Sequence, residues 1–174
     1  MRSCQTIACQ SLVVVLMLGA LAAPSCWAQP AAGTAAEKRP STAAQKDGEA
    51  AAKVEVKSTL DNLMAAYNGE SNAHARYLAF AKKADQEGYG AVASLFRAAA
   101  RAEEIDARNH AEVIKKMGST PKADVKTPEV KSTKENLQAA IEGETYEFKA
   151  MYPAFLKKAR ADKNRDAFRT LEYA

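Results

Sequence analysis

The stretch VKSTLDNL at positions 56–63 decides the fold, because the chain repeats it as VKSTKENL at 130–137. The correspondence continues, first at the same offset and then after one inserted residue, through these pairs: Gly69-Glu70 with Gly143-Glu144, Tyr77 with Tyr152, Phe80 with Phe155, and 82–84 with 157–159. A repeat of this length, without strand signals, predicts a duplicated helical hairpin.

Both repeats open with a helix-capping pattern, Ser58 with Asp61 and Ser132 with Glu135. A hydroxyl and a carboxylate three residues apart satisfy the free N–H groups of a first helical turn. Glycines at 88, 90 and 118 mark the ends of helices. We therefore expect helices at about 59–87, 91–117, 132–161 and, incompletely, 164–174. This is an all-α antiparallel four-helix bundle with a long middle connection and an incomplete fourth helix.

Acidic residues and histidines lie on the faces that these helices should turn toward the core. The 3-and-4 spacing places them there in three helices: Glu70 and His74; Glu103, Asp106 and His110; Glu144 and Glu147. Burying several unpaired carboxylates is so unfavourable that a bound cation is the simplest way to offset the cost. Carboxylate oxygens with one or two imidazoles on facing helices favour iron or manganese over a structural zinc ion.

The constellation resembles the di-iron domain of the rubrerythrins, which belong to the ferritin-like superfamily, over about residues 57–174. Three motifs carry the resemblance: Gly69-Glu70-Ser71 followed by Tyr77, Ala102-Glu103-Glu104, and Gly143-Glu144-Thr145-Tyr146-Glu147 leading to Met151-Tyr152-Pro153. The resemblance implies a ferritin-like bundle with two non-haem iron ions. It also implies metal ligands at Glu70, Glu103, Glu144 and Glu147, and catalytic-site tyrosines at Tyr77 and Tyr152 that hydrogen-bond to ligands.

Two departures from the family's pattern affect the ligand set. The family has histidine where this chain has Asp106, which either ligates through oxygen or takes no part in binding metal. We expect His74 and His110 to support ligands or fill the core rather than bind metal. The family's last Glu-x-x-His would fall beyond Ala174. On that basis we expect incomplete iron binding, and an uncovered apolar face that favours a homo-oligomer.

Two functions follow from the resemblance. The first is a peroxide-reducing oxidoreductase with two iron ions, or possible manganese, whose substrate is hydrogen peroxide. No cysteine follows Cys26, so we expect no rubredoxin or iron–sulfur centre, and no haem; electrons then come from a separate donor protein. The alternative is a non-catalytic or degenerate iron-binding bundle.

The N-terminal region predicts export. Arg2, the apolar run 12–23 and Ala28 match a signal peptide at 1–28, with an uncleaved anchor or lipid attachment at Cys26 as alternatives. An Ala-rich flexible linker is expected at 29–56, and the bundle domain at 57–174. We expect a periplasmic or secreted protein with no membrane span after cleavage. The net charge of +4 is interleaved along the helices, which argues against a nucleic-acid partner.

Overall fold

The computed structural model describes residues 54–174, so the predicted signal peptide and most of the predicted linker lie outside the described residues. The described part is helical and contains no strand: α2 (Thr59–Gln86), α3 (Gly90–Lys116), α4 (Thr133–Tyr146), the π-helix η1 (Glu147–Met151), α5 (Tyr152–Ala161) and α6 (Arg165–Glu172). The prediction of an all-α bundle is confirmed. None of these helices is long and apolar enough to cross a membrane.

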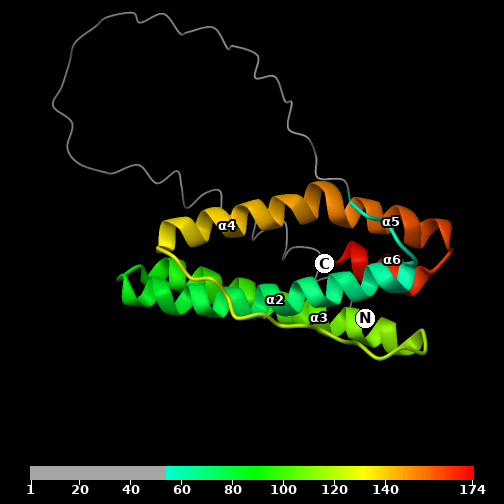
Figure 1. Ribbon diagram of the computed structural model, residues 1–174, viewed down its shortest axis with the longest axis horizontal. Helices are drawn as coiled ribbons and strands as arrows, with labels where there is room; N and C mark the ends of the chain where they lie inside the picture. The colour runs from blue at the N-terminus through cyan, green and yellow to red at the C-terminus, as the bar shows by residue number, and fades with distance from the viewer. Residues whose placement is uncertain (1–53) are drawn as a thin grey trace, which may run out of the picture.

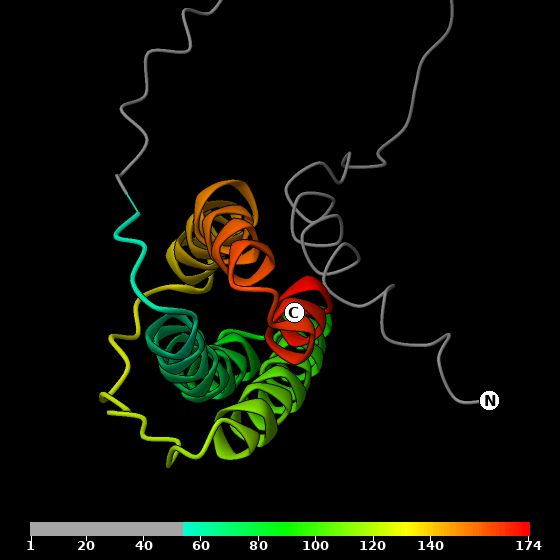
Figure 2. The ribbon, with the colours of Figure 1, turned by 90° about the vertical axis from the view of Figure 1, so that its right-hand side faces the viewer.

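The helices occupy four positions around a shared core. In Figure 1, α2 and α3 lie side by side, and α4, η1 and α5 follow one another as a third rod above them. The connection at 117–132 runs back along the bundle, so that α4 begins at the end where α3 also begins. Figure 2, seen along the bundle, shows α6 beside α5 and α3, in the fourth position. Consecutive helices in each half are therefore antiparallel.

The predicted capping patterns form at both repeat starts. The Ser58 hydroxyl accepts a hydrogen bond from the backbone N–H of Asp61 at 3.1 Å. Ser132 and Glu135 form a complete capping box, in which each side chain bonds to the other residue's backbone N–H. Gly88 adopts a φ of 81° just after α2, a left-handed conformation that glycine enters without steric cost. These local signals account for the helix boundaries.

The third rod differs from the expected continuous helix at 132–161, because the five residues of η1 interrupt it. The repeat explains the interruption: one residue is inserted between the Glu70–Glu144 pair and the Tyr77–Tyr152 pair. A π turn absorbs a single inserted residue without ending a helix. It therefore keeps Tyr152 on the face that Tyr77 occupies in the uninterrupted α2.

The two halves also hold each other at their ends. The Thr59 hydroxyl at the start of α2 donates to Asp162, beyond the end of α5, at 2.7 Å. The backbone N–H of Thr133 at the start of α4 donates to Glu87, beyond the end of α2, at 2.9 Å. Each repeat thus closes the N-terminus of its first helix against an acidic residue of the other repeat, and this fixes the register between the rods.

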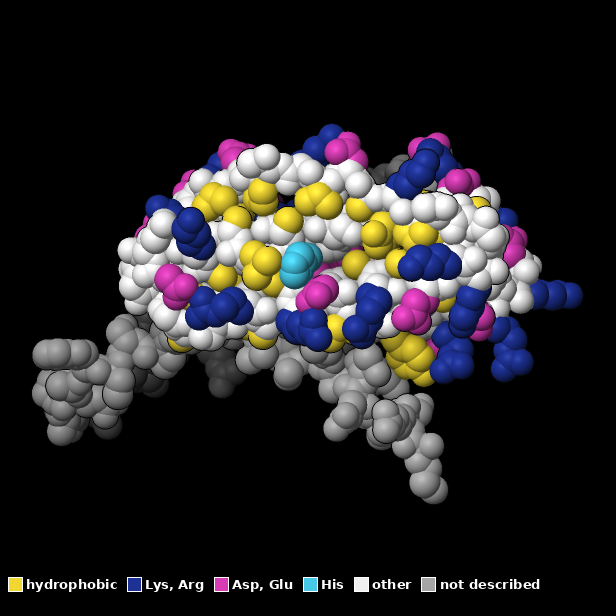
Figure 3. All heavy atoms as spheres, turned by 90° about the horizontal axis from the view of Figure 1, so that it is seen from below, with side chains coloured by type: hydrophobic (Ala, Val, Ile, Leu, Met, Phe, Trp, Pro, Cys, Tyr) yellow, Lys and Arg dark blue, Asp and Glu magenta, His cyan; other side chains and the backbone are white. Residues whose placement is uncertain are grey.

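The core consists of two apolar clusters. One cluster lies near the α2–α3 turn and contains Phe80, Phe96 and Leu137 among its buried residues. The other lies toward the opposite end and contains Leu63, Ile114 and Phe155. On the face shown in Figure 3, basic and acidic side chains alternate around a band of hydrophobic ones, as the interleaved sequence charges predict. The candidate site lies in the middle of the bundle, between the two apolar clusters.

Candidate metal centre

The acidic residues singled out from the sequence meet in this middle layer. Glu70 on α2, Glu103 and Asp106 on α3, and Glu144 on α4 are buried, with exposed fractions of 0%, 3%, 5% and 7%. Glu147 begins η1 and remains partly exposed, which differs from the fully inward position expected for it. Its placement follows from the π turn, which widens the helix at this residue. The predicted burial is confirmed for the other four.

Two tyrosines donate hydrogen bonds to the carboxyl groups of Glu70 and Glu144. The Tyr77 hydroxyl on α2 donates to Glu144 Oε1 on α4 at 2.5 Å. The Tyr152 hydroxyl on α5 donates to Glu70 Oε1 on α2. Because Tyr77 corresponds to Tyr152 and Glu70 to Glu144 in the repeat, each repeat's tyrosine bonds to the other repeat's glutamate. The duplication has produced a reciprocal pair of hydrogen bonds across the layer.

Burial and mutual repulsion keep protons on several of these carboxyl groups in the absence of a cation. Burial, followed by hydrogen bonding with Glu70, raises the pKa of Glu103 well above its ordinary value. Burial likewise raises the pKa of Glu144, against the hydrogen bond from Tyr77. For Glu147, burial of the carboxyl end and the charges of Glu70 and Glu144 raise the pKa to about 9. The layer as a whole favours added positive charge.

The tyrosines themselves remain protonated donors. Burial is the largest cause that raises the pKa of both Tyr77 and Tyr152, and the adjacent carboxylates add to it. The Tyr77 ring packs against Phe96 and Phe80, with ring centroids 5.9 and 6.2 Å away. Arg76 lies over the other part of this ring, 5.3 Å from its centroid. Tyr77 is thus fixed by packing as well as by its hydrogen bond.

The two histidines behave differently from each other. His110 on α3 is fully buried and contacts Tyr152, with its Nε2 atom 3.2 Å from the phenolic oxygen. His74 on α2 is only partly buried, although it shares the predicted inward face, and its Nδ1 lies 2.7 Å from the carbonyl oxygen of Ala100. The structure therefore brings His110, rather than His74, into the hydrogen-bond network of the carboxylates.

The donor set fits a hard metal ion. Glu70 Oε2 and Glu103 Oε2 are buried, and neither has a hydrogen-bond partner among the described residues. Unpartnered buried carboxylate oxygens are unfavourable, and a cation between them would satisfy both. Within residues 54–174, however, no three acidic, histidine or cysteine side chains stand in a preformed metal-binding geometry. Glu144 and Glu70 instead accept hydrogen bonds from Tyr77 and Tyr152, so metal binding requires proton loss and side-chain rotations.

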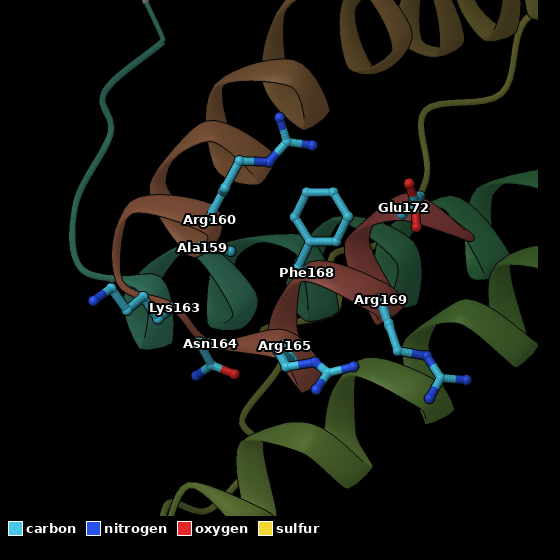
Figure 4. Close-up of a pocket in the computed structure, with 8 residues that line it drawn as sticks. All are labelled: Ala159, Arg160, Lys163, Asn164, Arg165, Phe168, Arg169 and Glu172. Carbon is cyan, nitrogen blue, oxygen red and sulfur yellow. The ribbon is translucent and has the colours of Figure 1, made fainter.

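A separate surface hollow of about 380 Å³ lies away from this layer, between α5 and α6. Figure 4 shows the Phe168 ring at its centre, surrounded by basic side chains that spread in different directions. Arg160 covers this ring, with its guanidinium carbon 4.9 Å from the ring centroid. The hollow includes none of the five candidate metal ligands. The buried layer, rather than the hollow, holds the chemistry indicated by the sequence.

Two further residues contact the site but do not stand out from the sequence. Arg76 is the cation that lowers the pKa of Glu144 and Glu147, against the stronger effect of burial. Thr170 on α6 lies 2.9 Å from His110 Nδ1 through its hydroxyl oxygen. Arg76 lies beside Tyr77 rather than on the inward spacing, and Thr170 is one hydroxyl in a short polar helix. No sequence signal distinguishes either residue.

These features define a helical bundle with an acidic centre, and the comparisons identify its family. The pattern of the Rubrerythrin family matches residues 61–174, so the chain belongs to the rubrerythrin family. Rubrerythrin-2 of Clostridium acetobutylicum is 42% identical over 128 residues, which cover 67% of this chain and 64% of that protein. Nigerythrin of Nitratidesulfovibrio vulgaris is 44% identical over 116 residues, which cover 66% of this chain and 57% of nigerythrin.

Solved structures agree with this assignment. Nigerythrin in a partially reduced state superposes with a TM-score of 0.67 at 40% identity, over 71% of this chain and 62% of that chain. The fully reduced, all-ferrous state of nigerythrin gives the same TM-score, identity and coverage. The present chain thus spans about three fifths of the length of these relatives. The family resemblance inferred from the motifs is confirmed.

Proposed function

We propose that the buried acidic layer binds two non-haem iron ions, and that the iron-loaded chain reduces hydrogen peroxide with electrons from a separate donor protein. The single observation that carries the proposal is the burial of Glu70, Glu103 and Glu144 together, with two carboxylate oxygens left unpartnered. Several carboxyl groups buried in one layer are unfavourable unless they stay protonated or share a cation, so the layer is suited to binding metal. Membership of the rubrerythrin family supports iron as that cation.

The candidate ligands come from three rods of the bundle: Glu70, Glu103, Asp106, Glu144 and Glu147. An all-oxygen set suits iron or manganese, since both accept hard carboxylate ligands. The all-ferrous nigerythrin structure favours iron over manganese by analogy. Asp106 is buried in this layer and supplies oxygen where the family has an imidazole nitrogen. We include it in the ligand set on that ground.

The proposed reaction consumes two electrons and two protons for each peroxide, breaks the O–O bond and yields two water molecules. Ferrous ions held by these carboxylates would supply one electron each to the peroxide and would polarise its O–O bond. Tyr77 and Tyr152 hold Glu144 and Glu70 in place through their hydroxyl groups. Residues 27–174 contain no cysteine that could hold an electron-transfer iron within the bundle, and we propose that a separate donor protein restores the two electrons.

The proposal is tested with the full chain, loaded anaerobically with ferrous iron and then mixed with hydrogen peroxide. We expect two ferrous ions to be oxidised per peroxide, and repeated turnover once a reductant is added. The Glu103→Gln variant should lose this reaction. Glu104→Gln, which changes the exposed neighbouring residue on α3, should retain it. Equal rates in the wild type, both variants and iron-free controls would refute the proposal.

A second candidate is an iron-binding bundle without turnover, which Asp106 favours because an additional carboxylate stabilises ferric iron more than imidazole does. Bound iron that peroxide oxidises only once, with no turnover in the presence of reductant, would select this function. Export to the periplasm or medium, a homo-oligomeric state and loading with manganese instead of iron stay further proposals. Each depends on the sequence expectations given above.

A further inference from the structure

His110 links α6 to the acidic layer through two hydrogen bonds. Its Nδ1 atom lies 2.9 Å from the Thr170 hydroxyl oxygen, and its Nε2 atom lies 3.2 Å from the Tyr152 hydroxyl oxygen. The imidazole is fully buried, so neither nitrogen is satisfied by solvent. The chain of contacts runs from Thr170 through His110 and Tyr152 to Glu70.

Counting protons fixes the direction of every bond in this chain. The Tyr152 hydroxyl has one hydrogen, which it donates to Glu70. The phenolic oxygen must then accept from His110, and Nε2 of the imidazole therefore carries the hydrogen. In a neutral imidazole, Nδ1 is then an acceptor, so the Thr170 hydroxyl is its donor. Each group in the chain donates to the next.

We propose that His110 is a positioning residue of this site: as the Nε2–H tautomer, with the Thr170 hydroxyl donating to its Nδ1, it holds the Tyr152 hydroxyl toward Glu70. The direction of the hydrogen-bond chain follows from the contacts alone. Its importance for metal binding rests on the proposed function, in which Glu70 is a ligand. A hydrogen-bonded support of this kind sets the orientation and basicity of the carboxylate it reaches.

Tyr77 and Tyr152 differ in how strongly neighbouring side chains restrict their rings. Tyr77 stacks against Phe96 and also has the Arg76 guanidinium over its ring, and both contacts restrict the ring. Among the described residues, the one aromatic ring that pairs with Tyr152 is His110, at a centroid distance of 6.2 Å. Tyr152 also directly follows the π turn of η1. His110 thus supplies the restraint that aromatic packing supplies to Tyr77.

The charge state of the imidazole agrees with this role. Burial lowers the pKa of His110 to about 4, while the nearby Glu70 charge acts in the opposite direction. At neutral pH the ring is therefore uncharged and carries a single hydrogen. The hydrogen-bond chain requires a single hydrogen on the imidazole, because a second hydrogen on Nδ1 would clash with the hydrogen that Thr170 donates to this atom.

The tautomer is measured directly by nitrogen-15 NMR of the histidine side chains in the metal-free full chain at neutral pH. We expect a protonated Nε2 and an unprotonated Nδ1 for His110. Tyr152→Phe, which removes the acceptor of the Nε2 hydrogen, should shift the ring toward a tautomer mixture, and Thr170→Ser, which keeps the hydroxyl beside Nδ1, should not. A wild-type His110 protonated on Nδ1, or a tautomer equally fixed in Tyr152→Phe, would overturn the proposal.

A second pair of variants tests the effect on metal. His110→Leu removes both hydrogen bonds, and we expect about tenfold weaker ferrous binding, at the lower end for residues that support ligands. His110→Gln keeps an N–H donor near the Nε2 position and should recover most of the affinity. Thermal unfolding confirms that both variants fold. Equal ferrous affinities for the two variants would count against positioning by Nε2–H. If the wild type shows the expected tautomer but fails to bind iron, the proposed function is refuted and the hydrogen-bond proposal is not.

Discussion

Tyr152 on α5 donates its hydroxyl hydrogen to Glu70 on α2, a residue 82 positions earlier in the chain. The other oxygen of Glu70 has no hydrogen-bond partner within residues 54–174. This bond joins the second half of the bundle to the first at the level of the acidic layer. It also leaves half of the Glu70 carboxylate available to a cation.

Replacing Tyr152 with phenylalanine should destabilise the metal-free chain. The change leaves a buried carboxylate and the His110 N–H without their shared partner, which corresponds to about 1–3 kcal/mol in the free energy of unfolding. Tyr67→Phe is the matched control on α2, because its hydroxyl makes no hydrogen bond within the described residues; we expect less than about 0.5 kcal/mol. Urea unfolding measures both, and equal losses would show that the Tyr152 hydroxyl has no special role.

Neutralising Glu103 should separate metal binding from stability. In Glu103→Gln we expect less bound iron, because a central ligand is lost. The metal-free fold should be as stable as the wild type or more so, because the amide replaces a buried carboxyl group that is unfavourable to ionise. Iron analysis after dialysis and thermal unfolding give the two quantities. Glu104→Gln, on the exposed side of α3, should alter neither. Unchanged iron content in Glu103→Gln would contradict the site assignment.

The metal-free chain should lose stability as the pH rises from about 6.5 to about 9. Burial raises the pKa of Glu147 in the folded chain to about 9, from an ordinary value of 4.5. Between these pH values the folded state binds more protons than the unfolded state, so the free energy of unfolding falls as the pH rises. His110 opposes this fall below pH 6.5, where the unfolded imidazole takes up a proton that the folded one, with a pKa of about 4, does not. Above pH 6.5 the carboxyl effect therefore stands alone.

Glu147→Gln should flatten this pH dependence, because the amide does not titrate. Glu142→Gln, at an exposed position on α4, should leave the slope unchanged. Denaturant unfolding at several pH values measures the slopes for all three chains. If the free energy of unfolding of the metal-free wild type rises between pH 6.5 and 9, the statement that the Glu147 pKa is raised is wrong.

The N-terminal expectation has its own test, since it falls outside the described residues. Expression of the full chain in a bacterium with a periplasm should yield a mature protein that begins at Gln29. Cleavage after Ala28 follows from the basic start, apolar run and small residues of the signal pattern. Intact-mass spectrometry of the periplasmic fraction identifies the end. A cytoplasmic chain that retains Met1 would argue against export.

The sequence was sufficient to predict most of the bundle because its signals are local. Ser58 and Ser132 mark helix starts through their own hydroxyl groups, and the 3-and-4 spacing places Glu70, Glu103 and Glu144 inward regardless of the partner helix. The π turn of η1 was missed as a structure, although the inserted residue between the repeats indicated that one residue had to be accommodated.

The remaining contacts depend on how the helices pack, and sequence spacing does not determine them. Thr170 reaches His110 because α6 lies against α3, and Arg76 faces Glu144 because α4 packs on α2. His74 has the same spacing as buried residues, yet it lies at the edge of the α2–α3 contact and stays partly exposed. Such positions depend on the rotation of each helix about its axis. Helix propensity and hydrophobic periodicity do not determine this rotation.

The most direct test of the central claim is anomalous X-ray diffraction, at the iron absorption edge, from crystals of the iron-loaded chain. The account predicts two anomalous peaks within the acidic layer, bordered by Glu70, Glu103, Glu144 and Glu147. Iron found only at the protein surface, or crystals from iron-loaded protein with no anomalous peak in this layer, would contradict it.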